Sequence, residues 1–175
     1  MDVGEVLTRA AAWLALTSYV AGESVAAART SPRPSKLAWW LNTAGCGFFL
    51  LHVTGAFHVF YNWSHAVAYA DTARQSKELT GWDSGAGIYI NYAFTLLWLA
   101  EVFWSGLKPG GYSARPRGVT RAVRAFFLFM IVNGAFVFVR GNIRWLGLAL
   151  CLVLVGAWWL RFKRTIDPRL PSKAS

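Results

Sequence analysis

Residues 145–162 read WLGLALCLVLVGAWWLRF, and Arg161 is the only charged residue in this run. A helix needs about 20 mostly apolar residues to cross the hydrocarbon core of a bilayer. The run is the most uniformly apolar part of the chain. It therefore predicts a membrane-spanning helix close to the C-terminus.

The whole chain shares this apolar character. Of its 175 residues, 55% are hydrophobic and 15% are charged, and the chain contains 10 tryptophans and 12 phenylalanines. Soluble domains are about one quarter charged. Both cysteines, Cys46 and Cys151, lie inside apolar runs, which excludes a disulfide scaffold. The composition also excludes disordered, collagenous and coiled-coil proteins, and it leaves an all-α polytopic membrane protein.

Four further segments are long and apolar enough to accompany the run at 145–162. We expect one integral-membrane domain over residues 1–175, folded as a bundle of five transmembrane helices. The first span is the weakest, because it contains Arg9 and Glu23. The helical pattern of the second continues through Trp63, His65 and Tyr69, so this helix is predicted to be the longest and to project beyond the outer leaflet. The expected spans are residues 6–28, 37–62, 88–107, 122–139 and 145–162.

The basic residues predict the orientation of the bundle. Cytoplasmic loops are enriched in Lys and Arg, which are drawn to anionic headgroups. This pattern places the N-terminus outside and the C-terminus in the cytoplasm, in a bacterial inner membrane or an equivalent membrane. Most of the 18 Lys and Arg residues follow the first, third and fifth spans: Arg29, Arg33, Lys36, Lys108, Arg115, Arg117, Arg121, Arg124, Arg161, Lys163, Arg164, Arg169 and Lys173.

Two other interpretations of these features fit less well. The net charge of +10 does not indicate nucleic-acid binding, because the basic residues form short clusters between apolar runs. Residues 26–28, three alanines, resemble a signal-peptide cleavage site. Cleavage there would leave Arg29, Arg33 and Lys36 outside, against the charge distribution.

Ionisable side chains inside the expected spans are the candidate functional residues. Each costs about 2.5–3.5 kcal/mol to insert, and such residues mark function by default. Sequential antiparallel helices pack side by side, so His52 of the second span and Glu101 of the third are expected to meet. Glu23 is expected near Glu101 in the inner half. His58 and His65 are seven residues apart and are expected to share one helix face.

A second polar group is expected in the outer half of the bundle. It consists of His58 with Asn62, Asn91 and Asn133. Above the membrane, the polar segment 72–78 is expected to continue the second helix and to form a lip over a site at His65 and Asp71. Each of these residues also has a plain structural interpretation, as a hydrogen-bonding group that fixes the packing of helices.

Three functions are compatible with these residues. The preferred one is a small integral membrane protein that forms part of a membrane complex, with other membrane subunits or as a homo-oligomer. The second is an oxidoreductase that uses a transition metal or haem and acts on a lipid or quinone-like substrate. The spacings of His52, His58 and His65 match no compact ligand motif, so a haem would need histidines from two protomers. The third is a proton-coupled transporter that uses Glu23, His52 and Glu101.

Overall fold

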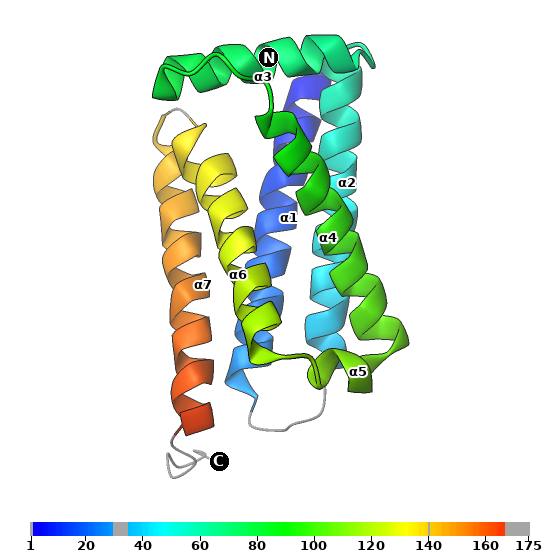
Figure 1. Cartoon of the computed structure of the whole chain (residues 1–175), viewed down its shortest axis with the longest axis vertical. Helices are drawn as coiled ribbons and strands as arrows, with labels where there is room; N and C mark the ends of the chain where they lie inside the picture. The colour runs from blue at the N-terminus through cyan, green and yellow to red at the C-terminus, as the bar shows by residue number, and fades with distance from the viewer. Residues whose placement is uncertain (1, 30–34, 140, 167–175) are drawn as a thin grey trace.

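Five helical columns run up and down side by side, and a further helix lies across their upper end (Figure 1). The columns are α1 (Val3–Ala28), α2 (Lys36–Val59), α4 (Gly87–Leu107), α6 (Arg117–Val132) and α7 (Ile143–Ile166). This computed structural model describes residues 2–29, 35–139 and 141–166, which contain helices but no β-strand. The predicted all-α class is therefore confirmed.

Successive columns alternate in direction. α1 begins at the upper end, and α7 ends at the lower end (Figure 1). A π-helical turn, η1 (Asn133–Val137), extends α6 upward, and α3 (His65–Thr80) lies across the upper end between α2 and α4. The single-turn helix α5 (Pro109–Ser113) connects α4 to α6 at the lower end. The order and direction of the columns match the alternation expected from the apolar segments.

The prediction of one long second helix is wrong. α2 has 24 residues against 26 in α1, and it ends at Val59. Asn62 and Trp63 adopt positive φ angles of 44° and 60°, a left-handed conformation that stops an α-helix. The Trp63 N–H donates back to the Phe57 carbonyl oxygen (2.9 Å), closing the end of α2. The chain then turns into α3, which lies across the bundle instead of projecting from it.

The core of the bundle is built from aromatic rings on three helices. Tyr19 of α1 stacks on Phe127 of α6 with ring centroids 4.9 Å apart, and it meets the edge of Trp98 of α4 at 5.5 Å. Gly45 of α2 allows the backbone of α1 to approach, because a Cβ there would lie 3.1 Å from the Ala15 carbonyl oxygen. The core therefore combines large rings with small residues at the helix contacts.

Close packing also joins the upper ends of α7 and the α6–η1 column. A Cβ on Gly147 of α7 would lie 2.2 Å from the Ala135 carbonyl oxygen and 2.8 Å from its carbonyl carbon. Only glycine fits this contact, because the obstructing atoms belong to the backbone. Gly147 thus sets the approach of α7 to η1.

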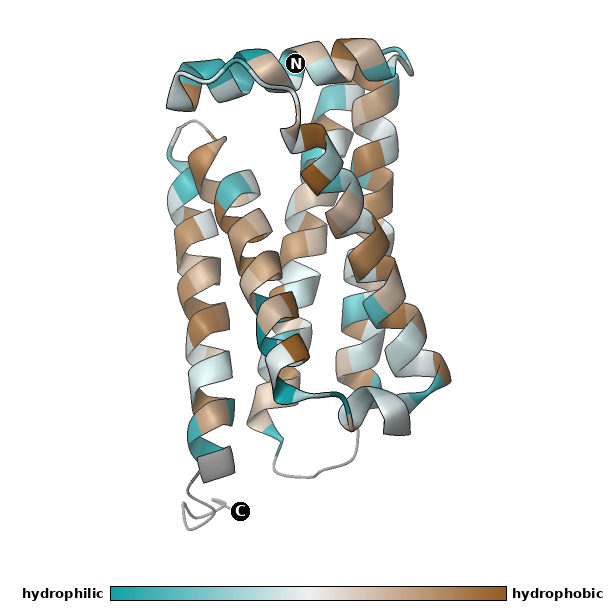
Figure 2. Ribbon diagram, in the orientation of Figure 1, coloured by the Kyte–Doolittle hydropathy of each residue, from teal (hydrophilic) through white to brown (hydrophobic). Residues whose placement is uncertain are grey.

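Large apolar side chains are exposed along the columns. Figure 2 shows hydrophobic residues along α4, α6 and α7, whereas hydrophilic residues are frequent in α3 and at the lower end of α6. In a soluble bundle most of these side chains would be buried. Examples from each column are Leu7, Leu14, Leu51, Leu96, Phe103, Phe129, Leu152 and Leu160.

Two of the described stretches are long and apolar enough to cross a membrane, Arg117–Val137 and Ile143–Arg164. Five such stretches were expected, so spans in α1, α2 and α4 are not confirmed. Polar residues interrupt the apolar sequences of these helices, such as Asn42 and His52 in α2 and Asn91 and Glu101 in α4.

Candidate functional site

His52 and Glu101 have separate hydrogen-bond partners at different heights in the bundle. The Nδ1–H of His52 donates to the Thr8 carbonyl oxygen of α1 (2.9 Å). His52 lies about two turns below the upper end of α2, whereas Glu101 lies less than two turns above the lower end of α4. His52 therefore joins α2 to α1, and the carboxylate that it was expected to meet is engaged elsewhere.

Glu101 belongs to a partly buried cluster at the lower end, which we call the Glu101 cluster (Glu101, Tyr112, Arg115 and Thr120). Arg115 Nη1 forms an ion pair with Glu101 Oε1, and the Tyr112 hydroxyl donates to Oε2 (2.7 Å). The Arg115 and Glu101 side chains are 7% and 14% exposed. Arg115 Nε also donates to Thr120 Oγ1 (3.0 Å), so one guanidinium connects α4, α5 and α6.

The ring of Tyr112 completes the Glu101 cluster. The Arg115 guanidinium carbon lies 4.2 Å from the ring centroid, and Arg115 Nη2 donates to the Tyr112 hydroxyl (3.2 Å). Burial raises the pKa of the Tyr112 hydroxyl well above its ordinary value, and the negative charge of Glu101 adds to this shift. Tyr112 is therefore a neutral hydrogen-bond donor to the carboxylate.

Glu23 forms a second, partly buried site in the lower half, the Glu23 cluster (Glu23, Arg124 and Trp158). Trp158 Nε1 of α7 donates to Glu23 Oε2 (2.6 Å), and Arg124 Nη2 of α6 donates to the same oxygen (3.3 Å). The Arg124 guanidinium lies 5.3 Å from the Trp158 ring centroid. Three columns, α1, α6 and α7, thus meet at one carboxylate.

Both clusters lie in the lower half of the bundle. Glu23 is five residues before the end of α1, and Glu101 is six residues before the end of α4. The structure therefore places Glu23 and Glu101 in the same region of the bundle, each with its own arginine. Sequence reasoning missed these partners, because Arg115 and Arg124 were counted only as membrane-flanking charges. The sequence did contain one signal for them. A carboxylate placed among apolar residues needs a nearby cation, and Glu23 and Glu101 are two such carboxylates.

The other two histidines lie at the upper end and are exposed. The ring centroid of His58 is 6.2 Å from that of Trp63, and His65 Nδ1 shares a 2.9 Å hydrogen bond with the Tyr92 hydroxyl. The turn between α2 and α3 separates them, so the expectation that they share one helix face is wrong. His65 contributes instead to an aromatic group with Tyr69, Tyr89 and Tyr92.

Asp71 anchors α3 to the turn that precedes it. Its carboxylate accepts hydrogen bonds from Gln75 Nε2 (2.7 Å) and the Tyr61 hydroxyl (3.2 Å), and it pairs with Arg74. Burial raises the pKa of Asp71, but the hydrogen bonds from Arg74, Gln75 and Tyr61 outweigh burial, and the pKa lies below its ordinary value. Asp71 is thus held ionised as part of the α3 anchor.

The three asparagines have different surroundings. Asn62 forms part of the turn between α2 and α3, and Asn91 is exposed on α4. Asn133 Nδ2 donates to the Phe129 carbonyl oxygen of its own column (2.7 Å). None of these interactions joins an asparagine to His58. They therefore do not support the expected outer-half group of His58 with the three asparagines.

No three His, Cys, Asp or Glu side chains come close enough to hold a metal ion among residues 2–29, 35–139 and 141–166. The expectation of a transition-metal site within this chain is not supported there, because the histidines and carboxylates have separate partners. A haem held between two protomers remains a prediction. Comparisons of the chain with models of protein families, with curated proteins and with solved structures find no match.

Proposed function

We propose that this chain is an integral membrane protein of five spans that serves as a helical component of a membrane complex. The observation that carries the proposal is the distribution of its side chains. Large apolar side chains are exposed along the columns, while the ion pairs Glu101–Arg115 and Glu23–Arg124 are inside. Water favours the opposite arrangement, and exposed apolar surface of this kind meets lipid or partner proteins.

The lengths of the columns support five crossings. At about 1.5 Å per residue, a 21-residue helix spans roughly 30 Å, which is the thickness of the hydrocarbon core. α1, α2, α4 and α7 have 26, 24, 21 and 24 residues, and the stretch Arg117–Val137 has 21. In the most apolar 18-residue windows of Arg117–Val137 and Ile143–Arg164, only 11% and 22% of the residues are buried, unlike the core helix of a soluble protein.

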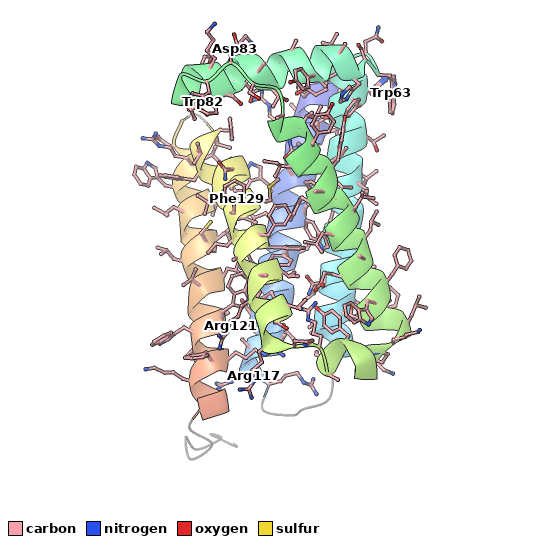
Figure 3. The ribbon with its side chains drawn as sticks, in the orientation of Figure 1. Trp63, Trp82, Asp83, Arg117, Arg121 and Phe129 are labelled. Carbon is pink, nitrogen blue, oxygen red and sulfur yellow. The ribbon has the colours of Figure 1, made fainter. Side chains whose placement is uncertain are left out.

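The two ends of the bundle differ in charge. Near the lower end, the described acidic residues are Glu23 and Glu101, and each is paired with an arginine. Arg117 and Arg121 lie at this end (Figure 3). Since cytoplasmic loops carry the excess of Lys and Arg, this asymmetry favours a cytoplasmic lower end. The basic residues described there are Arg29, Lys36, Lys108, Arg115, Arg117, Arg121, Arg124, Arg161, Lys163 and Arg164.

The upper end fits the outer interface of a membrane. Trp63 and Trp82 flank α3 and are 61% and 78% exposed. Tryptophan is enriched at the level of the lipid headgroups, where helices with a polar face lie parallel to the membrane. α3 therefore has the placement of an interfacial helix on the outer face.

The polar clusters favour a structural component over a transporter. A proton relay needs groups that exchange partners, whereas Glu23 and Glu101 are each fixed by an arginine and a further donor. The bonds of Glu23 also connect helices that are more than 100 positions apart in the sequence. The buried charges thus lock the bundle, and its apolar outer surface is left for lipid and partner subunits.

Labelling of single cysteines tests the topology. Cys46 and Cys151 are buried, so the parent chain serves as the unlabelled control. A membrane-impermeant maleimide applied to intact cells should label Ala86→Cys, at the exposed upper end, and should reach Ala114→Cys, at the exposed lower end, only after permeabilisation. The protein should also remain in membranes washed with alkaline carbonate. Release by carbonate, or labelling of both cysteines from outside, would contradict the proposal.

A further inference from the structure

A groove of about 360 Å³ runs between α1 and α7 near the lower end of the bundle. Its lining includes Ser24 and Ala27 of α1 and, on α7, Gly156, Ala157, Leu160 and Arg164. Small-molecule sites have volumes of roughly 300–1,000 Å³, so the groove has the size of a ligand site. Its walls are apolar apart from the serine hydroxyl and the arginine.

The groove exists because the facing residues are small. A Cβ on Gly156 would meet no atom within 4 Å, which shows open space directly above this residue. Ser24 turns its hydroxyl inward along its own helix, where it donates to the Val20 carbonyl oxygen (2.7 Å). The groove wall therefore offers methyl and methylene groups, which suits an extended hydrocarbon chain.

Arg164 fixes a positive charge at the lower end of this groove. Its Nη1 donates to the Ala27 carbonyl oxygen in the last turn of α1 (2.6 Å). That bond uses one of the five N–H donors of the guanidinium. A guanidinium can bind phosphate through two parallel N–H donors, and enough donors are left here for such a contact. Arg29 follows α1 directly, and the two acidic residues described at this end already pair with Arg115 and Arg124. The mouth of the groove is thus cationic.

We propose that the groove between α1 and α7 binds one anionic phospholipid, with an acyl chain along Gly156 and Ala157 and the phosphate at Arg164. The inference rests on the proposed function, because it assumes that the columns lie in a bilayer. It also goes further, since it assigns a lipid class and a position on the protein. Apolar walls select the chain, and the unbalanced positive charge selects an anionic headgroup.

Native mass spectrometry of the full-length protein in detergent tests the site. The probes are phosphatidylglycerol and phosphatidylcholine with the same acyl chains. The wild type should retain one phosphatidylglycerol and bind it at least fivefold more tightly than phosphatidylcholine. Gly156→Leu fills the open space and should weaken binding of both lipids at least fivefold. Gly47→Leu is the matched control, because a Cβ on Gly47 of α2 also meets no atom within 4 Å.

Variants of Arg164 test the headgroup contact separately. Arg164→Gln should remove the preference for phosphatidylglycerol, and Arg164→Lys should retain it. Lys163→Gln makes the same charge change one residue away, where the ammonium lies 5.4 Å from the Trp159 ring centroid, and it should leave the preference intact.

Three results would overturn the lipid site. They are equal binding of both lipids by the wild type, unchanged binding in Gly156→Leu, and a dimer of this chain that Gly156→Leu dissociates. The last result would assign the groove to a second copy. If the protein stays in carbonate-washed membranes but gives one of these results, only the lipid-site proposal is refuted. Release of the protein from the membranes refutes the proposed function.

Discussion

Trp158 and Glu23 are 135 positions apart in the sequence, and the indole Nε1 of the first donates a 2.6 Å hydrogen bond to the carboxylate of the second. Arg124 donates to the same oxygen. The bond joins the first and last columns of the bundle at a side chain that is 16% exposed. A partly buried carboxylate thus fixes the position of α7, which otherwise meets the bundle mostly through apolar contacts.

Replacement of this donor is predicted to destabilise the protein. Trp158→Phe keeps most of the ring but removes the Nε1–H, and it should lower the free energy of unfolding by about 1–2 kcal/mol, because the carboxylate loses a buried hydrogen bond. Trp159→Phe is the control, since that side chain is 56% exposed. Denaturant titration in detergent measures both variants, and equal losses would show that the bond contributes nothing specific.

The sequence predicts the columns well. Each expected segment coincides with a helix, because apolar side chains at helical spacing leave few alternatives. It fails at Asn62 and Trp63, where no glycine or proline interrupts the pattern. The Tyr61 hydroxyl beside this turn donates to the Asp71 carboxylate ten residues further on, a contact that periodicity does not report. Whether all five columns cross a bilayer is still a prediction.

The candidate site was only partly accessible from the sequence. Glu23 and Glu101 stand out because charge is rare in apolar segments. Their partners do not, since Arg115 reaches Glu101 only through the turn that α5 makes after α4. The partner of His52 is the backbone oxygen of Thr8, and a backbone acceptor has no sequence signature.

Loss of the Arg115 guanidinium is predicted to be severe. Arg115→Gln leaves the Glu101 carboxylate buried without its cation and should cost about 3–5 kcal/mol of unfolding free energy. The double variant Glu101→Gln/Arg115→Gln should recover part of the loss, because no unpaired charge remains. Arg117→Gln removes an exposed charge and should change stability by less than about 0.5 kcal/mol. Unfolding of the wild type, Arg115→Gln, Glu101→Gln, the double variant and Arg117→Gln in one detergent gives the comparison, and a loss in the double variant equal to the sum of the two single losses would exclude coupling.

The Asp71 anchor predicts a pH dependence at the upper end of the bundle. The pKa of Asp71 is lowered in the folded protein, so its contribution is fully present above the unfolded pKa, about 3.9, and is lost as the pH falls through the folded value. The difference in unfolding free energy between the wild type and Asp71→Asn should therefore be constant near pH 7 and shrink below about pH 4. Asp83→Asn is the control, because its ion pair with Lys77 is exposed and contributes little. A difference for Asp71→Asn that grows towards acid pH would contradict the anchor.

The contact between α7 and η1 predicts that Gly147 tolerates no side chain. Gly147→Ala places a methyl group 2.2 Å from the Ala135 carbonyl oxygen, so the two columns must separate, at a cost of about 1–3 kcal/mol. Gly134→Ala is the matched control in η1, because a Cβ there meets no atom within 4 Å. It should be neutral or slightly stabilising, since alanine restricts the unfolded chain. Thermal unfolding in detergent distinguishes the two variants. An unchanged midpoint for Gly147→Ala would mean that α7 does not pack against η1 at this distance.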